Sequence, residues 1–83
     1  MWWLYIIQSK SSGRFYVGHT NDLERRVAEH NEGQTKSTRG RGPWLLVLSE
    51  PFDTKEAAFA RERQIKSWKS HRSIAELIAG CSG

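Results

Sequence analysis

The stretch WWLYIIQSKSSGRFYVG, residues 2–18, sets the architecture of the chain. Its first part, residues 2–8, is rich in aromatic and β-branched residues and is predicted to form a strand. Trp3, Tyr5 and Ile7 share one face of that strand, and the even-numbered residues of the other face are also apolar. A strand that is apolar on both faces is expected at the centre of a sheet, covered from both sides.

A hairpin is predicted to follow this strand. Residues 9–13, Ser-Lys-Ser-Ser-Gly, have the composition of a turn, and residues 14–17 read as a second, short strand. The two strands are therefore expected to pair in an antiparallel hairpin. Gly18 is expected to end the second strand in a tight turn, because glycine tolerates backbone conformations that other residues avoid.

A helix is predicted next, capped by Asn21 or Asp22 and running to about residue 31. Hydrophobic spacing places residues 23, 27 and 30 on one face of this helix. At about 100° per residue, Arg26 flanks that face and Arg25 points almost opposite to it. Helical phasing therefore predicts that Arg26, and not Arg25, can reach the rest of the domain.

Three further elements are predicted beyond a polar, glycine-rich loop at residues 34–43. Residues 44–49 read as a third strand, which Pro51 is expected to break. Asp53 is expected to open a helix that runs to about residue 69, and Ser73 to open a last, short helix. The expected fold is α+β, a small and mainly antiparallel three-stranded sheet flanked by helices in the order β-β-α-β-α-α.

Composition limits the classes of protein that the chain can represent. Its 83 residues predict a single domain over residues 1–83, with a core at about 2–79 and a short tail. The lone Cys81 cannot form an intrachain disulfide, and the apolar start is too short to span a membrane and lacks signal-peptide features. A cytoplasmic protein that does not bind membranes is expected. The net charge of +4 suits a nucleic acid partner, although a basic surface alone would also explain it.

The motifs from Trp3 to about Trp68 resemble the GIY-YIG nuclease family. The first signature element is reduced to Trp3-Leu4-Tyr5, and the second is YVG at residues 16–18. The segments HTNDLERRVAEHN (19–31) and GRGPW (40–44) are typical of the family. The chain is similar to the small single-domain bacterial members, and to the nuclease domain of the structure-specific resolvase subunit that cuts branched DNA.

The resemblance implies catalytic roles for six residues: Tyr5, Tyr16, His19, Arg26, His30 and Glu62. Glu62 is implied to bind the metal, and the two histidines fall on auxiliary positions. Some family members add a later asparagine, but no Asn follows Asn31 here, so that role is absent or filled otherwise. The resemblance also implies a hydrolase, a GIY-YIG-type endonuclease.

The chemistry of phosphodiester hydrolysis is compatible with these residue types. Glu62 can hold one hard cation, Mg²⁺ or Mn²⁺, and the other acidic residues are too dispersed along the chain for a two-metal site. Arg26 can stabilise negative charge on the phosphate. Tyr5 is the expected general base, with its pKa lowered by Arg26 or the metal. Tyr16 and His19 are expected to position the water or relay its proton.

Each of these residues also has a purely structural interpretation. The two tyrosines could be ordinary strand aromatics, and His30 could simply pack on its helix. Arg26 could pair with Glu29 at the surface, and Glu62 could be a solvated charge linked to Lys66 four residues later. The ordered set as a whole favours the functional interpretation.

The leading hypothesis is a metal-dependent DNA endonuclease that acts on branched or damaged DNA in repair or recombination. No recognition helix or zinc finger is evident, so DNA is expected to be recognised by structure and not by sequence. Lys36, Arg39 and Arg41 are candidates for contacts with the DNA backbone. Two alternatives stay open, a basic module that binds nucleic acid without cutting it and a nuclease that is active only with a protein partner. No small-molecule cofactor is expected.

Overall fold

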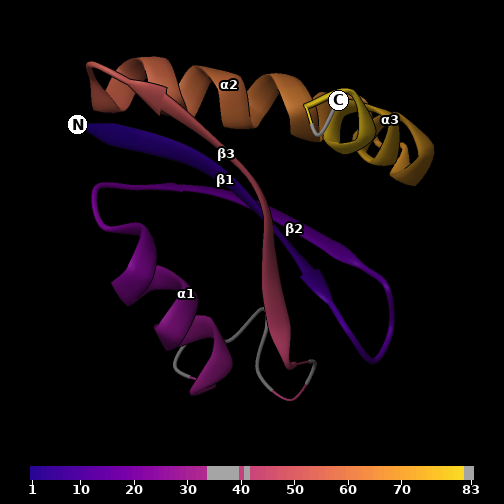
Figure 1. Ribbon diagram of the computed structural model, residues 1–83. Coiled ribbons are helices and arrows are strands. Elements are labelled where there is room, and N and C mark those ends of the chain that lie inside the picture. Colours follow the sequence, from indigo (N-terminus) through magenta and orange to yellow (C-terminus); the bar gives the residue numbers. More distant parts are fainter. Residues whose placement is uncertain (34–39, 41, 82–83) are drawn as a thin grey trace.

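The structure is a computed structural model that describes residues 1–33, 40 and 42–81, and the side chains among them up to residue 80. Six elements appear in the predicted order: β1 (Trp2–Ser9), β2 (Phe15–Thr20), α1 (Leu23–Asn31), β3 (Trp44–Phe52), α2 (Lys55–Ser67) and α3 (His71–Cys81). The predicted α+β fold is confirmed. Figure 1 shows that α1 lies on one side of the sheet and that α2 and α3 lie on the other.

The sheet has the strand order β2-β1-β3, and both pairs are antiparallel. The apolar first strand is therefore central, as its two apolar faces predicted. Tyr5 is opposite Gly18 of β2 on one side and Ser49 of β3 on the other. This register brings Tyr5 beside the edge strand β2, and it becomes important for the candidate site.

Each face of β1 supports its own hydrophobic cluster. Leu4 and Ile6 are fully buried against Ile65 of α2, and apolar residues of α3 pack around them. On the other face, Tyr5 and Ile7 pack with the partly buried apolar residues of α1. Burial on both faces holds β1 rigidly between two layers, so side chains from β1 can be positioned from either side.

The second strand is longer than its sequence predicted. Gly18 does not end β2, because pairing with β1 continues through His19 to Thr20. The chain turns only after Thr20, whose hydroxyl accepts a hydrogen bond from the backbone N–H of Asp22 at 3.1 Å. Gly18 therefore lies inside a strand, where its lack of a side chain matters for packing.

Pro51 does not break the third strand, which runs on to Phe52. Pro51 stands opposite Trp3 in the β1–β3 register. Since β3 is an edge strand, a residue without an N–H group can be accommodated where its missing donor would face away from the sheet. The sequence alone did not reveal that this strand lies at an edge.

The two C-terminal helices begin at different residues from those predicted. Thr54, not Asp53, caps α2, and its side chain accepts a hydrogen bond from the N–H of Ala57. The hydroxyl of Ser70 accepts from the N–H of Ser73, so α3 begins before Ser73. In both cases a hydroxyl residue near the predicted one, Thr54 one residue after it and Ser70 three residues before it, satisfies a free N–H of the first turn.

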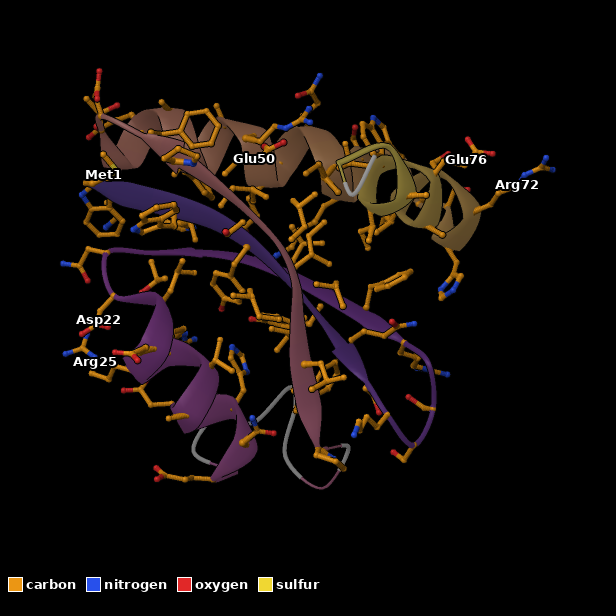
Figure 2. All side chains as sticks on the ribbon, viewed as in Figure 1. Met1, Asp22, Arg25, Glu50, Arg72 and Glu76 are labelled. Carbon is orange, nitrogen blue, oxygen red and sulfur yellow. The ribbon has the colours of Figure 1, made fainter. Side chains whose placement is uncertain are left out.

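Charged side chains cover the outer faces of the helices. In Figure 2, Arg72 and Glu76 extend from α3 away from the sheet, and their side chains form an ion pair at 3.2 Å. In the same view, Asp22 and Arg25 lie at the outer side of α1. No helix in the described ranges is both long enough and apolar enough to cross a membrane.

Candidate functional site

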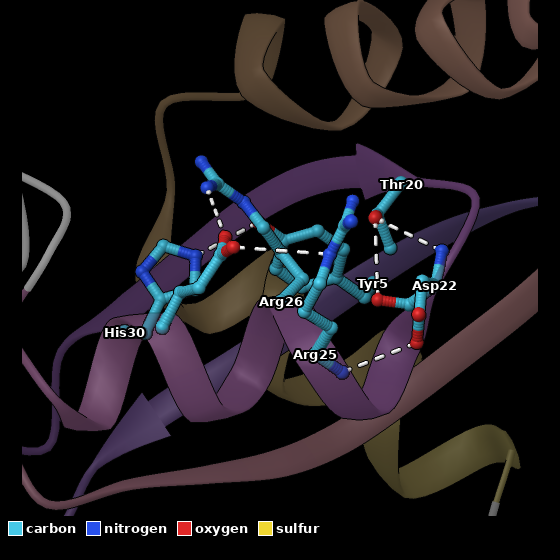
Figure 3. Close-up of polar contacts among 7 residues, drawn as sticks. Tyr5, Thr20, Asp22, Arg25, Arg26 and His30 are labelled. Carbon is cyan, nitrogen blue, oxygen red and sulfur yellow. Dashed lines mark hydrogen bonds and ion pairs between the residues drawn. The ribbon is translucent and has the colours of Figure 1, made fainter.

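The hydroxyl of Tyr5 is the centre of a buried polar group on the α1 side of the sheet. It lies 2.9 Å from Nε2 of His30 and 3.4 Å from Nε of Arg26 (Figure 3). Tyr5 and His30 are each only 1% exposed. Strand β1 contributes the phenol, and α1 contributes the imidazole and the guanidinium one helical turn apart.

The chemistry of the groups fixes the direction of the hydrogen bond from Arg26, whereas the direction of the one between Tyr5 and His30 depends on the tautomer of His30. A guanidinium only donates, so Tyr5 oxygen accepts the N–H of Arg26. The phenolic proton is then free to donate to Nε2 of His30, which must be unprotonated to accept it. This arrangement requires the neutral imidazole with its proton on Nδ1.

Burial sets the protonation of this group. It raises the pKa of Tyr5 to about 12, although the hydrogen bond and charge of Arg26 act in the opposite direction. Burial, together with the smaller effect of the positive charge of Arg26, also lowers the pKa of His30 to about 4. Both groups are therefore neutral at pH 7. Arg26 does lower the pKa of Tyr5, as expected, but desolvation outweighs it, so the net shift is upward and the expected lowered pKa of Tyr5 is not found.

Arg26 is held from two sides. Its Nη1 donates to Glu29 Oε1 at 3.0 Å, while its Nε donates to Tyr5. Its side chain is 34% exposed, against 66% for Arg25. The predicted phasing of α1 is confirmed, since Arg26 reaches the sheet and Arg25 faces outward. A partly exposed guanidinium with fixed orientation can bind an anion through its remaining N–H groups.

Gly18 allows Tyr5 to take this position. A Cβ atom on Gly18 would lie 2.5 Å from the hydroxyl oxygen of Tyr5 and 2.7 Å from its Cζ. The backbone of Gly18 does not have a positive φ, so the need for glycine here is steric and not conformational. The phenol lies directly against the backbone of the edge strand.

A second polar group lies on the α2 side. Oε1 of Glu62 is 2.7 Å from Nδ1 of His19, and Nζ of Lys66 donates to Oε2 at 2.9 Å. Glu62 is 8% exposed, so both carboxylate oxygens are paired in a largely buried position. The predicted pairing of Glu62 with Lys66 exists, but Glu62 is not the solvated charge of the structural interpretation.

Tyr16 stands between these two groups. Its ring centroid is 4.9 Å from that of His30 and 6.5 Å from that of Tyr5. The ammonium of Lys66 lies 5.8 Å from the same ring. The negative charge of Glu62 also contributes, less than burial does, to the raised pKa of Tyr5. The six residues singled out from the sequence therefore gather around the edge strand β2, in one group on each of its faces.

The residues present fit one divalent cation with few protein ligands. Within the described part of the chain, no group of three or more His, Cys, Asp or Glu side chains is placed to hold a metal. Glu62 offers a carboxylate beside the imidazole of His19. This set suits Mg²⁺, which keeps most of its waters and takes one or two carboxylates with phosphate oxygens. Lys66 would have to release Oε2 for a metal to bind there.

Sequence reasoning missed the position of Lys66. Besides pairing with Glu62 on its helix, Lys66 lies against the ring of Tyr16. The spacing of four residues from Glu62 indicated the ion pair, but only the packing of α2 against β2 revealed the contact with the tyrosine. Lys36, Arg39 and Arg41, predicted to contact DNA, lie outside the described residues.

Known proteins are similar to this chain over most of its length. The sequence profile described as the GIY-YIG catalytic domain matches residues 1–75. A UPF0213 protein of Haloquadratum walsbyi is 51% identical over 67 residues, which are 80% of this chain and 74% of that protein. A UPF0213 protein of Staphylococcus saprophyticus is 38% identical, and the match covers 94% of this chain and 95% of the relative.

A solved structure also matches. The solution NMR structure of a UPF0213 protein from Bacillus halodurans superposes with a TM-score of 0.60 at 38% sequence identity. The match covers 95% of this chain and 84% of that one. The names of these relatives state no activity, so they show the relationship and not the reaction.

Proposed function

Because the chain belongs to the GIY-YIG catalytic domain family, we propose that it is a metal-dependent endonuclease that hydrolyses phosphodiester bonds of DNA. The observation that carries the proposal is the convergence of Tyr5, Tyr16, Arg26 and Glu62 on one edge strand. The proposed catalytic unit is a single domain over residues 1–83, with its core at about 2–79.

Arg26 is proposed to bind the scissile phosphate. Its guanidinium is held by Tyr5 and Glu29, so little conformational entropy is lost when it meets an anion. A preorganised donor of this kind stabilises the charge that develops on the phosphate in the transition state. The buried Tyr5–His30 pair holds Arg26 through the hydrogen bond from its Nε to the Tyr5 oxygen, and both members of the pair are neutral.

His19 is proposed as the general base in place of Tyr5. With a pKa of about 12, Tyr5 is a poor acceptor of protons at neutral pH. The hydrogen bond between Nδ1 of His19 and Glu62 orients the imidazole so that Nε2 can take a proton from water. The imidazole is 22% exposed, so water can reach it. Tyr16, which lies next to Lys66, is proposed to position the attacked phosphate or the water.

Glu62, with His19 beside it, is the proposed holder of the cation. A bound Mg²⁺ or Mn²⁺ would supply neutralisation of charge on the phosphate oxygens. Lys66 then supplies a positive charge near Glu62 and Tyr16. No small-molecule cofactor enters the proposal.

The proposed substrate is branched or damaged DNA met during repair or recombination in the cytoplasm. The six described elements form one small domain, and its candidate site lies along a single edge strand, with Arg26 and His19 partly exposed. Such a surface suits recognition of DNA shape over recognition of base sequence. A protein partner that supplies further DNA contacts would be compatible with this small size.

The decisive experiment is a cleavage screen. Purified protein is incubated with linear, flapped, nicked and branched DNA, with Mg²⁺, with Mn²⁺ and with EDTA. We expect cutting that depends on the metal and is lost in Glu62→Ala, with wild-type binding of the uncut DNA as evidence that the variant is folded. The absence of cutting on every substrate, together with binding that depends on salt, would support the non-catalytic binding module instead.

A further inference from the structure

A basic pocket lies next to the candidate site, and apart from Tyr16 and Lys66 its lining residues have no role in the proposed chemistry. It has a volume of about 370 Å³ and lies between the first residues of β2 and the junction of α2 with α3. Arg14, Lys66, Lys69 and His71 contribute to its lining, and Asp and Glu side chains do not. We name it the β2–α3 pocket.

Two of the cations in this pocket lack a counter-charge. Within the described ranges, Lys66 is paired with Glu62, but no carboxylate forms an ion pair with Arg14 or Lys69. Elsewhere, Arg25, Arg61 and Arg72 are each within 4 Å of a carboxylate. Lys10, Lys55 and Arg63 also form no ion pair with a carboxylate in the described ranges, but they do not line the pocket. What sets Arg14 and Lys69 apart is that both line one pocket, where their charges could receive an anion together.

An aromatic pair forms one wall of the pocket. The rings of Phe15 and His71 are stacked, with centroids 4.5 Å apart and planes at 25°. Both residues line the β2–α3 pocket. Positive charge beside stacked rings suits a nucleotide, whose phosphate needs cations and whose base or sugar packs on flat apolar surface.

The pocket is continuous with the candidate site through two shared residues. Tyr16 and Lys66 line the pocket. The ammonium of Lys66 also donates a hydrogen bond to Glu62 and lies over the ring of Tyr16. A DNA strand bound at Arg26 and Glu62 can thus extend along β2 into the pocket. We propose that the β2–α3 pocket binds a backbone phosphate of the DNA strand next to the scissile one, with its nucleoside against Phe15 and His71.

This inference rests on the proposed function, but its test is independent of cutting. The full chain, labelled with ¹⁵N, is titrated first with inorganic phosphate and then with a short DNA oligonucleotide. Shifts of the amide signals of residues 14–17 and 66–71 are expected with both. An acidic peptide of equal charge that shifts these signals more than DNA does would overturn the proposal.

The sharper arm uses the double variant Arg14→Ala/Lys69→Asn. Asn is chosen because Lys69 has a φ of 48°, a region that Asn tolerates. The matched control is Lys10→Ala/Arg72→Ala, which removes the same charge from exposed residues outside the pocket. Relative to this control, we expect DNA affinity to fall about five- to tenfold at 0.1 M salt. The slope of the logarithm of the binding constant against the logarithm of the salt concentration (the salt slope) should become less steep by about 0.7–0.9, the effect of one lost phosphate contact.

Equal affinity and equal salt slope in the two double variants would overturn the subsite. If the wild type cuts DNA in that case, the proposed function stands and only the subsite fails. If the wild type cuts no DNA but the pocket variant still loses affinity, the proposed function fails and the anion site stands. Arg14→Gln, which keeps most of the side chain, repeats the measurement if the double variant melts earlier than the control.

Discussion

Gly18 stands opposite Tyr5 in the β1–β2 pair, and a Cβ atom on Gly18 would lie 2.5 Å from the hydroxyl oxygen of Tyr5. The contact decides where the phenol lies. Because the glycine leaves room, the hydroxyl reaches Arg26 and His30 instead of being pushed off the strand. Gly18, which the sequence predicted to be a turn residue, instead leaves the room that the buried hydroxyl of Tyr5 occupies.

Gly18→Ala should therefore damage both stability and activity. The added methyl group cannot fit without a shift of Tyr5 or of β2, and overpacking of this kind costs about 1–3 kcal/mol. We expect the free energy of unfolding in urea to fall by that amount and DNA cleavage to fall at least about tenfold. Gly80→Ala is the control, since open space surrounds that position within α3 and the substitution should be neutral or stabilising. Unchanged stability of Gly18→Ala would contradict the packing argument.

Arg26→Ala and Arg25→Ala form a matched pair of adjacent substitutions. Both arginines lie near Glu29, but only Arg26 donates to Tyr5. We expect kcat to fall by about 10²–10³ in Arg26→Ala, as for the loss of one preorganised donor, and to change less than twofold in Arg25→Ala. Single-turnover cleavage with excess enzyme gives the comparison. Equal losses in the two variants would show that helical phasing does not separate their roles.

His19→Asn tests the proposed general base. The amide of Asn can still donate to Glu62, but it has no nitrogen that can take a proton from water. We expect kcat to fall by about 10²–10⁴ while DNA affinity stays close to that of the wild type. Cleavage at the wild-type rate would remove His19 from the reaction. A thermal melt of the variant would verify that the sheet and α2 remain packed.

His30 should make stability depend on pH in the acid range. Burial, and then the charge of Arg26, lower its pKa from 6.5 to about 4, while nearby Glu29 acts in the opposite direction. Between these values the unfolded chain binds a proton that the folded chain excludes. The contribution of His30 is therefore full above about pH 6.5 and is lost as the pH falls towards 4, by up to about 3 kcal/mol.

His30→Gln isolates this effect. Its side-chain oxygen can accept the hydrogen bond from Tyr5 but does not titrate. Urea unfolding at pH 7, 6, 5 and 4 should show a smaller loss of stability in His30→Gln than in the wild type. Carboxylates titrate in both proteins, so the difference between the two curves is the measurement that matters. Parallel curves would contradict a neutral, buried imidazole.

Much of the fold was predictable because its elements have strong local patterns. The apolar run of β1, with two apolar faces, indicated a central strand, and the structure confirms that position. The cap at Asp22 and the spacing of α1 also predicted that Arg26 and Arg25 would differ. Boundaries were less accurate at Gly18, Pro51 and Asp53, where strand pairing and a neighbouring hydroxyl outweighed the local signal.

The sequence by itself determined the order of the elements, the family and the residue types available for chemistry, because these depend on local periodicity and short motifs. Only the tertiary structure decided how these residues meet. The Tyr5–His30 contact spans 25 residues of chain and the His19–Glu62 contact spans 43. The neutral state of Tyr5 and His30 depends on burial that both layers create together. The β2–α3 pocket likewise exists only where an edge strand meets two helices distant in sequence.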